Sequence, residues 1–335
     1  MKTNILAPSG LFAVAICIGT CQVMAVSPPI RNLFVANFGS GDITEITPGG
    51  SESTFASGFS DPSGLAFNSA GDLFVASGGI SGTITEITPN GTKSTFASGL
   101  NNPIGLAFNS AGDLFVAIQA SSIGSGSIVK ITPNGTQSTF AMVANPYGLA
   151  FNSAGNLFVG SIGNNNAIVE ITPGGLESTF ASGLDWPTAL AFNSAGDLFV
   201  ASEQNSTIYE YTPNGTRSTY ASVFAPWGLA CDSAGNVYET DSYLNSVTVI
   251  TPDGTQSTYA SGLTDPIGLA FQGVGLPVPE PTVLAVLGAG ALMLVIRSGK
   301  HFPLAKIITR IPKECVAVAS CKTREVAGIV RTSTA

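Results

Sequence analysis

Short apolar runs alternate with polar turn residues along most of this chain, and the alternation has a fixed period. Self-similarity at a period of roughly 20 to 50 residues is typical of repeat architectures, in which each repeat is one supersecondary unit. Val237-Tyr238-Glu239 stands where a sixth copy of the triplet Leu-Phe-Val is due, so we predict six units of about 40 residues. The five regular triplets begin at Leu33, Leu73, Leu114, Leu157 and Leu198.

Each unit is predicted to form four short strands. Asn134-Gly135, between the last two strands of the third unit, is a strong hairpin signal and predicts a turn whose two central residues have positive φ. Pro133 belongs to the same turn, where its missing N–H costs no ladder bond. Four strands in a unit of this size make one blade, so we predict an all-β, six-bladed β-propeller over residues 31–275. The strands of the third unit are 105–108, 114–117, 127–132 and a segment through Thr139 and Phe140.

The two ends of the repeat region complement each other. The first complete strand, 33–36, has the pattern of a second strand, whereas the last, 268–271, has the pattern of a first strand. We therefore predict that 266–271 docks as the innermost strand of the blade formed by 33–55. Such a closure leaves no unpaired sheet edge.

The repeat Pro-x-Gly-Leu-Ala-Phe-Asn-x-x-Gly-Asp/Asn-Leu-Phe-Val-Ala resembles the NHL repeat. It is also similar to the propeller repeats of the virginiamycin B lyase and gluconolactonase (SMP-30) groups, over about residues 32–271. The resemblance implies a six-bladed propeller but is weak evidence for a function, because one fold hosts many activities.

The N-terminus has the features of a secretory signal peptide. Lys2 precedes the apolar segment 11–25, which ends in Val23-Met24-Ala25, with small residues at the expected cleavage positions. We expect residues 1–25 to be removed and the protein to be exported. A lipoprotein signal ending at Cys21 is the alternative.

A second apolar run, 282–296, follows Pro279-Glu280-Pro281 and precedes Arg297. This arrangement resembles the PEP-CTERM sorting signal of bacterial exported proteins, which implies processing by an exosortase and transfer to the cell surface or extracellular matrix. A helix of this length falls short of the roughly 30 Å hydrocarbon core, so segment 277–299 is expected to anchor the chain only transiently. We expect the basic tail 300–335 to be disordered, with a functional domain there as the alternative.

Charge is distributed unevenly. Residues 31–271 hold 18 Asp and Glu against 4 Lys and Arg, whereas 297–335 hold 8 basic against 2 acidic residues. An acidic surface repels phosphate, so nucleic acid is not expected as a partner. The cysteines expected after cleavage, Cys231, Cys315 and Cys321, have no spacing typical of a disulfide framework.

Candidate binding residues are those that break the repeat. Asp241 is the only charged residue at its repeat position, Glu239 replaces the valine of Leu-Phe-Val, and Glu203 lies in the neighbouring unit. We expect these three carboxylates to converge, where they could hold a divalent cation. Aromatic rings beside carboxylates suit sugar or peptide recognition, although the two tryptophans could instead pack over blade junctions. The aromatic candidates are Tyr243 and three residues that we expect in the loops between blades, Tyr147, Trp186 and Trp227.

Two functions remain open from the sequence. The lyase group is known for a histidine acting with a metal, and the only histidine here is His301, outside the predicted propeller. Cys231 replaces the phenylalanine of an inner strand and is expected to be a small buried hydrophobe. The favoured hypothesis is a non-catalytic binding or structural module for extracellular polysaccharide or protein, with no cofactor. The alternative is a metal-dependent lyase or lactonase-like hydrolase that uses Glu203, Glu239 and Asp241.

Overall fold

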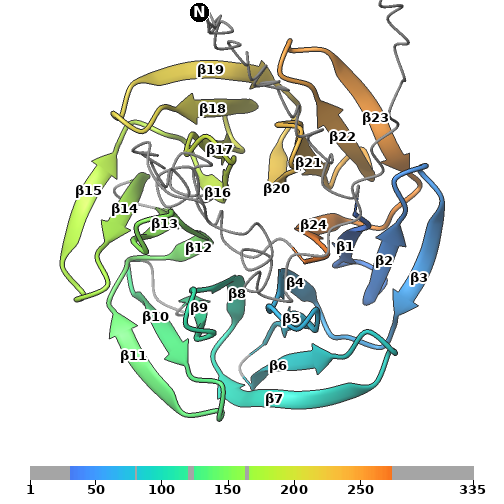
Figure 1. Ribbon diagram of the computed structural model, residues 1–335, viewed down its shortest axis with the longest axis vertical. Coiled ribbons are helices and arrows are strands. Elements are labelled where there is room, and N and C mark those ends of the chain that lie inside the picture. Colours follow the sequence, from blue (N-terminus) through green and yellow to red (C-terminus); the bar gives the residue numbers. More distant parts are fainter. Residues whose placement is uncertain (1–30, 80, 120–123, 163–165, 274–335) are drawn as a thin grey trace, which may run out of the picture. The chain divides into compact units, whose positions relative to one another are not determined.

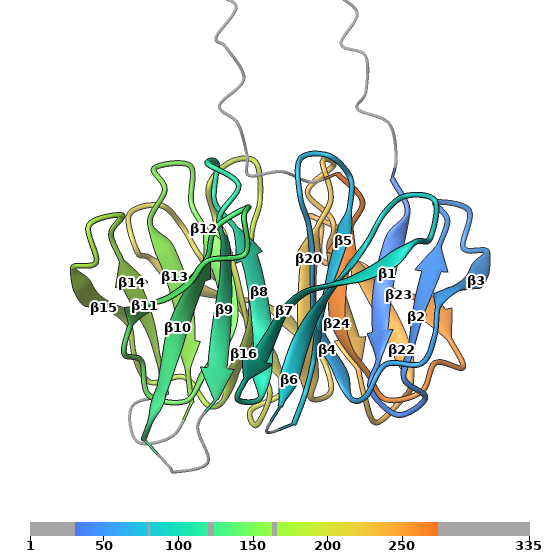
Figure 2. The ribbon, with the colours of Figure 1, turned by 90° about the horizontal axis from the view of Figure 1, so that it is seen from below.

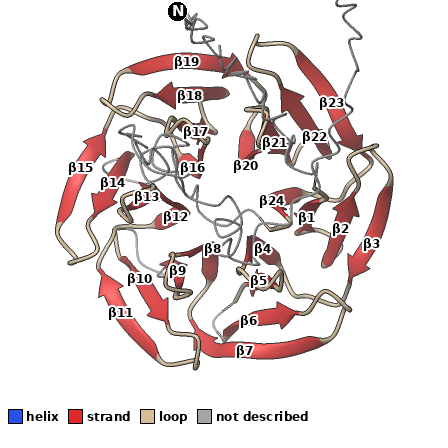
Figure 3. Ribbon diagram, in the orientation of Figure 1, coloured by secondary structure: helices blue, strands red, loops and turns tan. Residues whose placement is uncertain are grey.

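Every strand in the described part of the chain belongs to one of six four-stranded antiparallel sheets. The computed structural model describes residues 31–79, 81–119, 124–162 and 166–273. The sheets stand as blades around a common centre (Figure 1), and their strands run between two faces of the ring (Figure 2). The described residues contain strands and loops only (Figure 3), so the predicted six-bladed propeller is confirmed.

The blades follow the chain from the innermost to the outermost strand, with one exception in blade 1. Blade 1 consists of β24 (Pro266–Phe271), β1 (Leu33–Asn37), β2 (Asp42–Ile46) and β3 (Glu52–Ala56). Blade 2 consists of β4 (Pro62–Phe67), β5 (Leu73–Ser77), β6 (Gly82–Ile87) and β7 (Lys93–Leu100), and blade 3 of β8 (Pro103–Phe108), β9 (Leu114–Gln119), β10 (Gly126–Ile131) and β11 (Gln137–Ala141). Blade 4 consists of β12 (Pro146–Phe151), β13 (Leu157–Ser161), β14 (Ala167–Ile171) and β15 (Glu177–Ala181). Blade 5 consists of β16 (Pro187–Phe192), β17 (Leu198–Ser202), β18 (Thr207–Tyr211) and β19 (Arg217–Ser222), and blade 6 of β20 (Pro226–Cys231), β21 (Val237–Asp241), β22 (Ser246–Ile250) and β23 (Gln256–Ser261).

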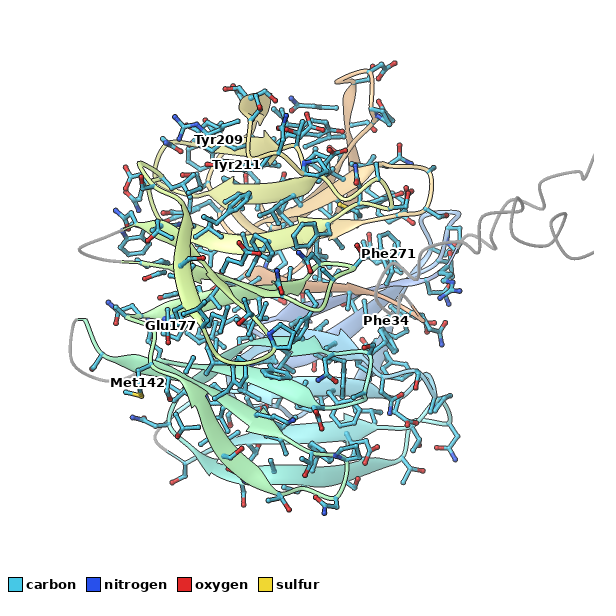
Figure 4. All side chains as sticks on the ribbon, turned by 60° about the vertical axis from the view of Figure 1, so that its left-hand side comes forward. Phe34, Met142, Glu177, Tyr209, Tyr211 and Phe271 are labelled. Atoms are coloured by element: carbon cyan, nitrogen blue, oxygen red, sulfur yellow. The ribbon has the colours of Figure 1, made fainter. Side chains whose placement is uncertain are left out.

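Blade 1 closes the ring because it combines strands from both ends of the repeat region. β24 pairs antiparallel with β1, and Leu33 lies opposite Phe271 in the register. Just beyond the strands, the backbone N–H of Gln272 donates to the carbonyl of Asn32 at 3.0 Å. Phe34 and Phe271 mark these two strands in Figure 4. The predicted docking of 266–271 against 33–55 is confirmed.

The predicted signal peptide 1–25, the sorting segment 277–299 and the tail 300–335 all lie outside the described residues. Within the described residues, no helix is both long and apolar enough to cross a membrane.

An asparagine side chain stabilises the tight turns between first and second strands. In the turn between first and second strands, Asn109 Oδ1 accepts hydrogen bonds from the N–H groups of Ala111 and Asp113 at 3.0 and 2.8 Å. The asparagine oxygen is therefore used within the turn, which agrees with a structural role for the Asn-Ser-Ala-Gly-Asp repeats.

The turn between third and fourth strands corrects one prediction. Of Asn134-Gly135, only Gly135 has positive φ, at 82°, and its N–H donates to the carbonyl of Thr132 at 2.8 Å. This geometry is a type I turn followed by a left-handed glycine, and not the predicted turn with two positive φ values. The physical reason is Pro133: its fixed φ suits the second position of a type I turn and makes the loop one residue longer.

Alternate residues of each second strand face the two neighbouring blades. On β1, Leu33 and Val35 pack with blade 6, whereas Phe34 and Ala36 pack with blade 2. The Phe34 ring meets Phe67 of blade 2 edge-on, with 5.1 Å between ring centroids. Because both faces of these strands are covered, all five residues of β1 are buried. The core thus consists of six seams between blades.

Glycines line the inner ring because neighbouring inner strands touch there through their backbones. A Cβ added to Gly105 would lie 2.0 Å from the carbonyl oxygen of Tyr147 in the next blade, and one added to Gly268 would lie 1.9 Å from that of Ser63. Blade 5 differs, since Ala189 occupies this repeat position. The narrow centre therefore depends on five glycines and one alanine.

Replacing Gly105 with alanine is expected to destabilise the propeller by about 1–3 kcal/mol, because the Tyr147 carbonyl must move to admit the methyl group. Gly49→Ala is the matched control: its nearest neighbouring atom would be 4.0 Å away and no positive φ is recorded there, so stability should hardly change. Urea unfolding of both variants measures the difference. Equal midpoints would contradict the backbone contact at the inner ring.

Candidate functional site

A cavity lined by described residues lies at one end of the central channel. Its volume is about 610 Å³. It opens on the face that carries the loops between second and third strands and the connections between blades, which we call the loop face. The opposite end, on the turn face, has a smaller and more apolar cavity of about 380 Å³. The loop-face cavity is lined by Phe38, Asp61, Ser63, Gly78, Asn102, Ile104, Gln119, Tyr147, Trp227, Ser242, Tyr243, Asp265 and Ile267.

A backbone conformation that recurs in all six blades forms the rim of this cavity. Each inner strand begins with a proline, and the residue before that proline has positive φ, for example 48° at Asn102 and 50° at Asp265. In five of the blades its carbonyl accepts the N–H of a residue at the end of the second strand or just beyond it: Gln119 N–H, for example, donates to the carbonyl of Asn102 at 3.2 Å. Asn and Asp tolerate this left-handed conformation better than most residues do. The six rim residues are Asp61, Asn102, Asn145, Trp186, Ala225 and Asp265.

Tyr147 and Trp227 form the aromatic part of the cavity. They occupy the second position of β12 and β20, in blades 4 and 6, and their ring centroids lie 6.4 Å apart at an angle of 51°. We expected both in loops between blades, whereas both belong to inner strands. The indole N–H of Trp227 is buried and has no hydrogen-bond partner.

Two amide side chains orient the tyrosine. Asn102 Nδ2 donates to Gln119 Oε1 at 2.8 Å, and Gln119 Nε2 donates to the Tyr147 hydroxyl oxygen at 2.8 Å. Because the hydroxyl oxygen accepts this bond, its own proton is left to donate to a ligand. The chain of hydrogen bonds therefore presents one oriented donor inside the cavity.

The structure separates Trp186 from the other aromatic candidates. Trp186 is itself a rim residue, with φ of 54° and 38% of its surface exposed, and it is not among the residues that line the cavity. A positive φ is rare for a bulky residue, so this backbone is strained. The prediction that groups Trp186 with Tyr147 and Trp227 is not supported by their positions.

Tyr243 joins the cavity from the loop of blade 6. It is 65% exposed and meets Phe224 edge-on, with 5.7 Å between ring centroids. Asp241 holds this loop, because its Oδ1 accepts the backbone N–H groups of Tyr243 and Leu244 at 2.9 and 2.7 Å. Asp241 is thus a positioning residue, because it fixes the loop that carries Tyr243 at the cavity.

The predicted three-carboxylate centre does not assemble. Among the described residues, no three His, Cys, Asp or Glu side chains are grouped so that they could hold a metal ion. Glu203 is 5% exposed and accepts a hydrogen bond from Gln204 at 2.5 Å, and Glu239 and Asp241 are 2% and 1% exposed. None of the three lines the cavity.

Glu239 is nevertheless unusual. It lies on β21 and faces blade 5. The equivalent position in each of the other five blades is a valine. The Oε2 atom of Glu239 has no hydrogen-bond partner. Burial raises the pKa of Glu239 to about 8; a hydrogen bond with Thr248 lowers it, and the nearby Asp241 raises it further. Glu239 is therefore mostly protonated at neutral pH.

Cys231 lies at the other end of the channel, among the residues of the turn-face cavity. Burial, with a further contribution from Asp232, raises the pKa of its thiol well above its usual range. A thiol in this state is a poor nucleophile, in agreement with the expectation of a small hydrophobe.

Six polar or charged residues of the cavity were not among the sequence candidates: Asp61, Ser63, Asn102, Gln119, Ser242 and Asp265. Three of them, Asp61, Asn102 and Asp265, share a signal that could have found them: each stands before an inner-strand proline, a position where Asp, Asn, Trp and Ala occur. The apolar pattern of the repeat does not reveal this position, because the rim residues lie between the strands.

Comparison with known proteins adds the fold but no family. No family model matches the chain, and no curated protein matches it. Virginiamycin B lyase from Staphylococcus aureus is similar in structure, with a TM-score of 0.51 and 18% identity, over 63% of this chain and 77% of the lyase. A gluconolactonase from Xanthomonas campestris has a TM-score of 0.57 and 16% identity, over 63% of this chain and 79% of the lactonase.

The chain is thus an all-β, six-bladed propeller with a cavity at one mouth of its channel. Its resemblance to the lyase and gluconolactonase propellers is confirmed at the level of the fold. At such identities the likeness does not extend to activity, because unrelated functions share this fold.

Proposed function

We propose that this protein is an exported propeller that binds extracellular polysaccharide or protein at its loop-face cavity, without catalysing a reaction. The observation that carries the proposal is the pair Tyr147 and Trp227 at the channel mouth, with the Tyr147 hydroxyl oriented by Gln119. Export and sorting to the cell surface or matrix, with processing by an exosortase, are part of the proposal and rest on the sequence signals at the two termini.

The chemistry of the cavity suits recognition. Rigid aromatic rings offer apolar contact at little entropic cost, and the amides and carboxylates of the rim fix the orientation of a ligand through hydrogen bonds. The propeller also holds these groups in place before a ligand binds. The aromatic pair belongs to inner strands, and the polar rim residues of the cavity are held by backbone hydrogen bonds to the ends of second strands.

The alternative function is a metal-dependent lyase or lactonase-like hydrolase. Its support is that the two similar solved structures are enzymes by their names. The carboxylates that would hold the cation do not fit this role, because Asp241 Oδ1 caps its own loop and Glu203 lies in another blade, outside the cavity. Turnover of a lactone or a cyclic peptide ester that survives Trp227→Ala but stops in Glu239→Gln would favour the enzyme.

Trp227→Ala is expected to weaken binding about 30-fold on an array of oligosaccharides and peptides, since removal of a central aromatic anchor costs about 2 kcal/mol. Trp186→Ala removes the chain's only other tryptophan, which lies outside the cavity lining, and should bind normally. Tyr147→Phe, which removes only the oriented hydroxyl, should have an intermediate effect. Equal binding by the Trp227 and Trp186 variants would count against this site, provided that both melt as the unmodified protein does.

A further inference from the structure

The polar half of the loop-face cavity is acidic. Two rim carboxylates line it, the exposed Asp61 and the partly buried Asp265, in adjacent blades. No lysine, arginine or histidine is among the described residues that line the cavity. A concave site lined by one sign of charge, with low-dielectric walls, concentrates ligands of the opposite sign.

The basic residues of the propeller are engaged elsewhere. Residues 31–273 contain four of them, and Lys130 with Asp113 makes the only ion pair in the described part of the chain, at 2.7 Å. The other three donate to backbone carbonyls: Arg31 to Gln272, Lys93 to Ser57 and Arg217 to Gly183. Neither rim carboxylate is therefore paired with a basic residue of the part of the chain that the structure describes.

The aromatic half favours a narrow cationic group. The rings of Tyr147 and Trp227 are tilted by 51° and their centroids are 6.4 Å apart, so together they do not form one broad flat surface. An ammonium or guanidinium group on a slender alkyl stem needs only part of one ring face, where the ring quadrupole attracts it.

An exposed apolar patch adjoins the cavity on blade 6. It consists of Phe224, Tyr243 and Leu244, which are 57%, 65% and 66% exposed, and Tyr243 also lines the cavity. Adjacent exposed apolar side chains mark a contact surface. The apolar residues of a peptide would bury such a patch, whereas a polysaccharide would place hydroxyl groups on it.

We propose that the loop-face cavity binds a basic peptide segment of a protein partner, and this inference rests on the proposed function. A lysine or arginine side chain enters between the Asp61 and Asp265 carboxylates and the rings of Tyr147 and Trp227. Apolar residues flanking it in the same peptide lie on Phe224, Tyr243 and Leu244. The ligand is thus a protein partner and not a polysaccharide.

The test uses full-length protein carrying Trp186→Phe, so that Trp227 is the only indole and its fluorescence reports occupancy. The probes are three blocked tripeptides, leucine-X-leucine, in which X is lysine, norleucine or glutamate. The lysine peptide is expected to bind at least about tenfold more tightly than the norleucine peptide, with an affinity that falls as salt increases. The glutamate peptide should bind most weakly.

Asp61→Asn together with Asp265→Asn should reduce the lysine peptide to the affinity of the norleucine peptide. The substitutions preserve the rim, because Asn102 and Asn145 occupy the same position with positive φ in blades 3 and 4. Asp185→Asn is the control: it removes a loop-face charge outside the cavity lining and should leave the preference intact.

The remaining outcomes separate this inference from the proposed function. Equal affinity for lysine and norleucine peptides, with binding still lost in Trp227→Ala, would overturn the preference for a cation but would still support the loop-face cavity as the binding site. Binding of a chitosan oligosaccharide, with none of the peptides bound, would overturn the peptide partner in favour of a cationic polysaccharide. Ligand binding that is indifferent to Trp227 would overturn both.

Discussion

Glu239→Val is expected to stabilise the propeller by about 5 kcal/mol at pH 9 and by little at pH 4. The unfolded chain loses the Glu239 proton near the ordinary glutamate pKa of 4.5, whereas the folded protein keeps it up to a pKa of about 8. The folded state therefore binds more protons between these values, so stability falls as pH rises through this window and the loss is complete above pH 8. A difference of about 3.5 in pKa corresponds to about 5 kcal/mol.

Valine is the suitable replacement because the other five blades have a valine at the equivalent position of the same kind of seam. The equivalent residues are buried valines in the other blades, so a sixth should fit without strain. They are Val35, Val75, Val116, Val159 and Val200.

Urea unfolding between pH 4 and pH 9 measures the effect as the difference between the variant and the unmodified protein. Glu239→Gln keeps the shape without the charge and should also remove the pH-dependent loss. Glu177→Gln, at an exposed carboxylate labelled in Figure 4, should follow the unmodified protein at every pH. If the Glu239 variants show a constant offset with no widening toward high pH, the buried acid does not control this stability.

Deletion of β24 has the second large effect: chains lacking 266–271 should not unfold cooperatively at any temperature. Without β24, the N–H and C=O groups of β1 that pair with it become a free edge. Leu269 and Phe271 also leave the cluster that they form with Leu33 and Val35 of β1 and Tyr238 of blade 6. Blades 1 and 6 then lose their common seam, and the ring opens.

The hydrogen bonds across the closure contribute to the same result. Thr240 Oγ1 on β21 accepts the N–H of Gly228 at 2.8 Å and donates to the carbonyl of Ile267 on β24 at 3.1 Å. Differential scanning calorimetry should show no heat-absorption peak for the deleted chain and a normal peak for a control that lacks six residues, 326–331, of the tail. A cooperative transition in the chain without β24 would mean that five blades and an open sixth are stable by themselves.

The cavity shows which functional residues could be predicted and which could not. Tyr147, Trp227 and Tyr243 were candidates because each interrupts the repeat, and all three line the cavity. Trp186 interrupts it equally but takes a left-handed backbone conformation at the rim, where it is exposed and not part of the lining. Sequence periodicity identifies a departure from the pattern, but the direction of a side chain depends on the local φ and on what the neighbouring blade leaves open.

The carboxylates illustrate the same limit. Glu239 and Asp241 are two residues apart on one strand and therefore share a face, as their sequence spacing requires. The sequence does not reveal that this face turns into the seam with blade 5 instead of the channel, because the direction is set by the packing of entire blades. Glu203 is in a different blade, so its distance from the pair is purely a tertiary property.

The sequence by itself determined the all-β class, the number of blades and the closure by β24, because these follow from periodicity and from the complementary strands at the two ends. Local chemistry was enough to locate the turns, although Pro133 changed the predicted type of one of them. Only the tertiary structure decided that Tyr147 and Trp227, 80 residues apart in the sequence, share a cavity with the acidic rim and that Glu239 is buried in a seam. The reason is that a closed ring brings six distant inner strands to one centre, where the contacts depend on which blades face each other across the channel.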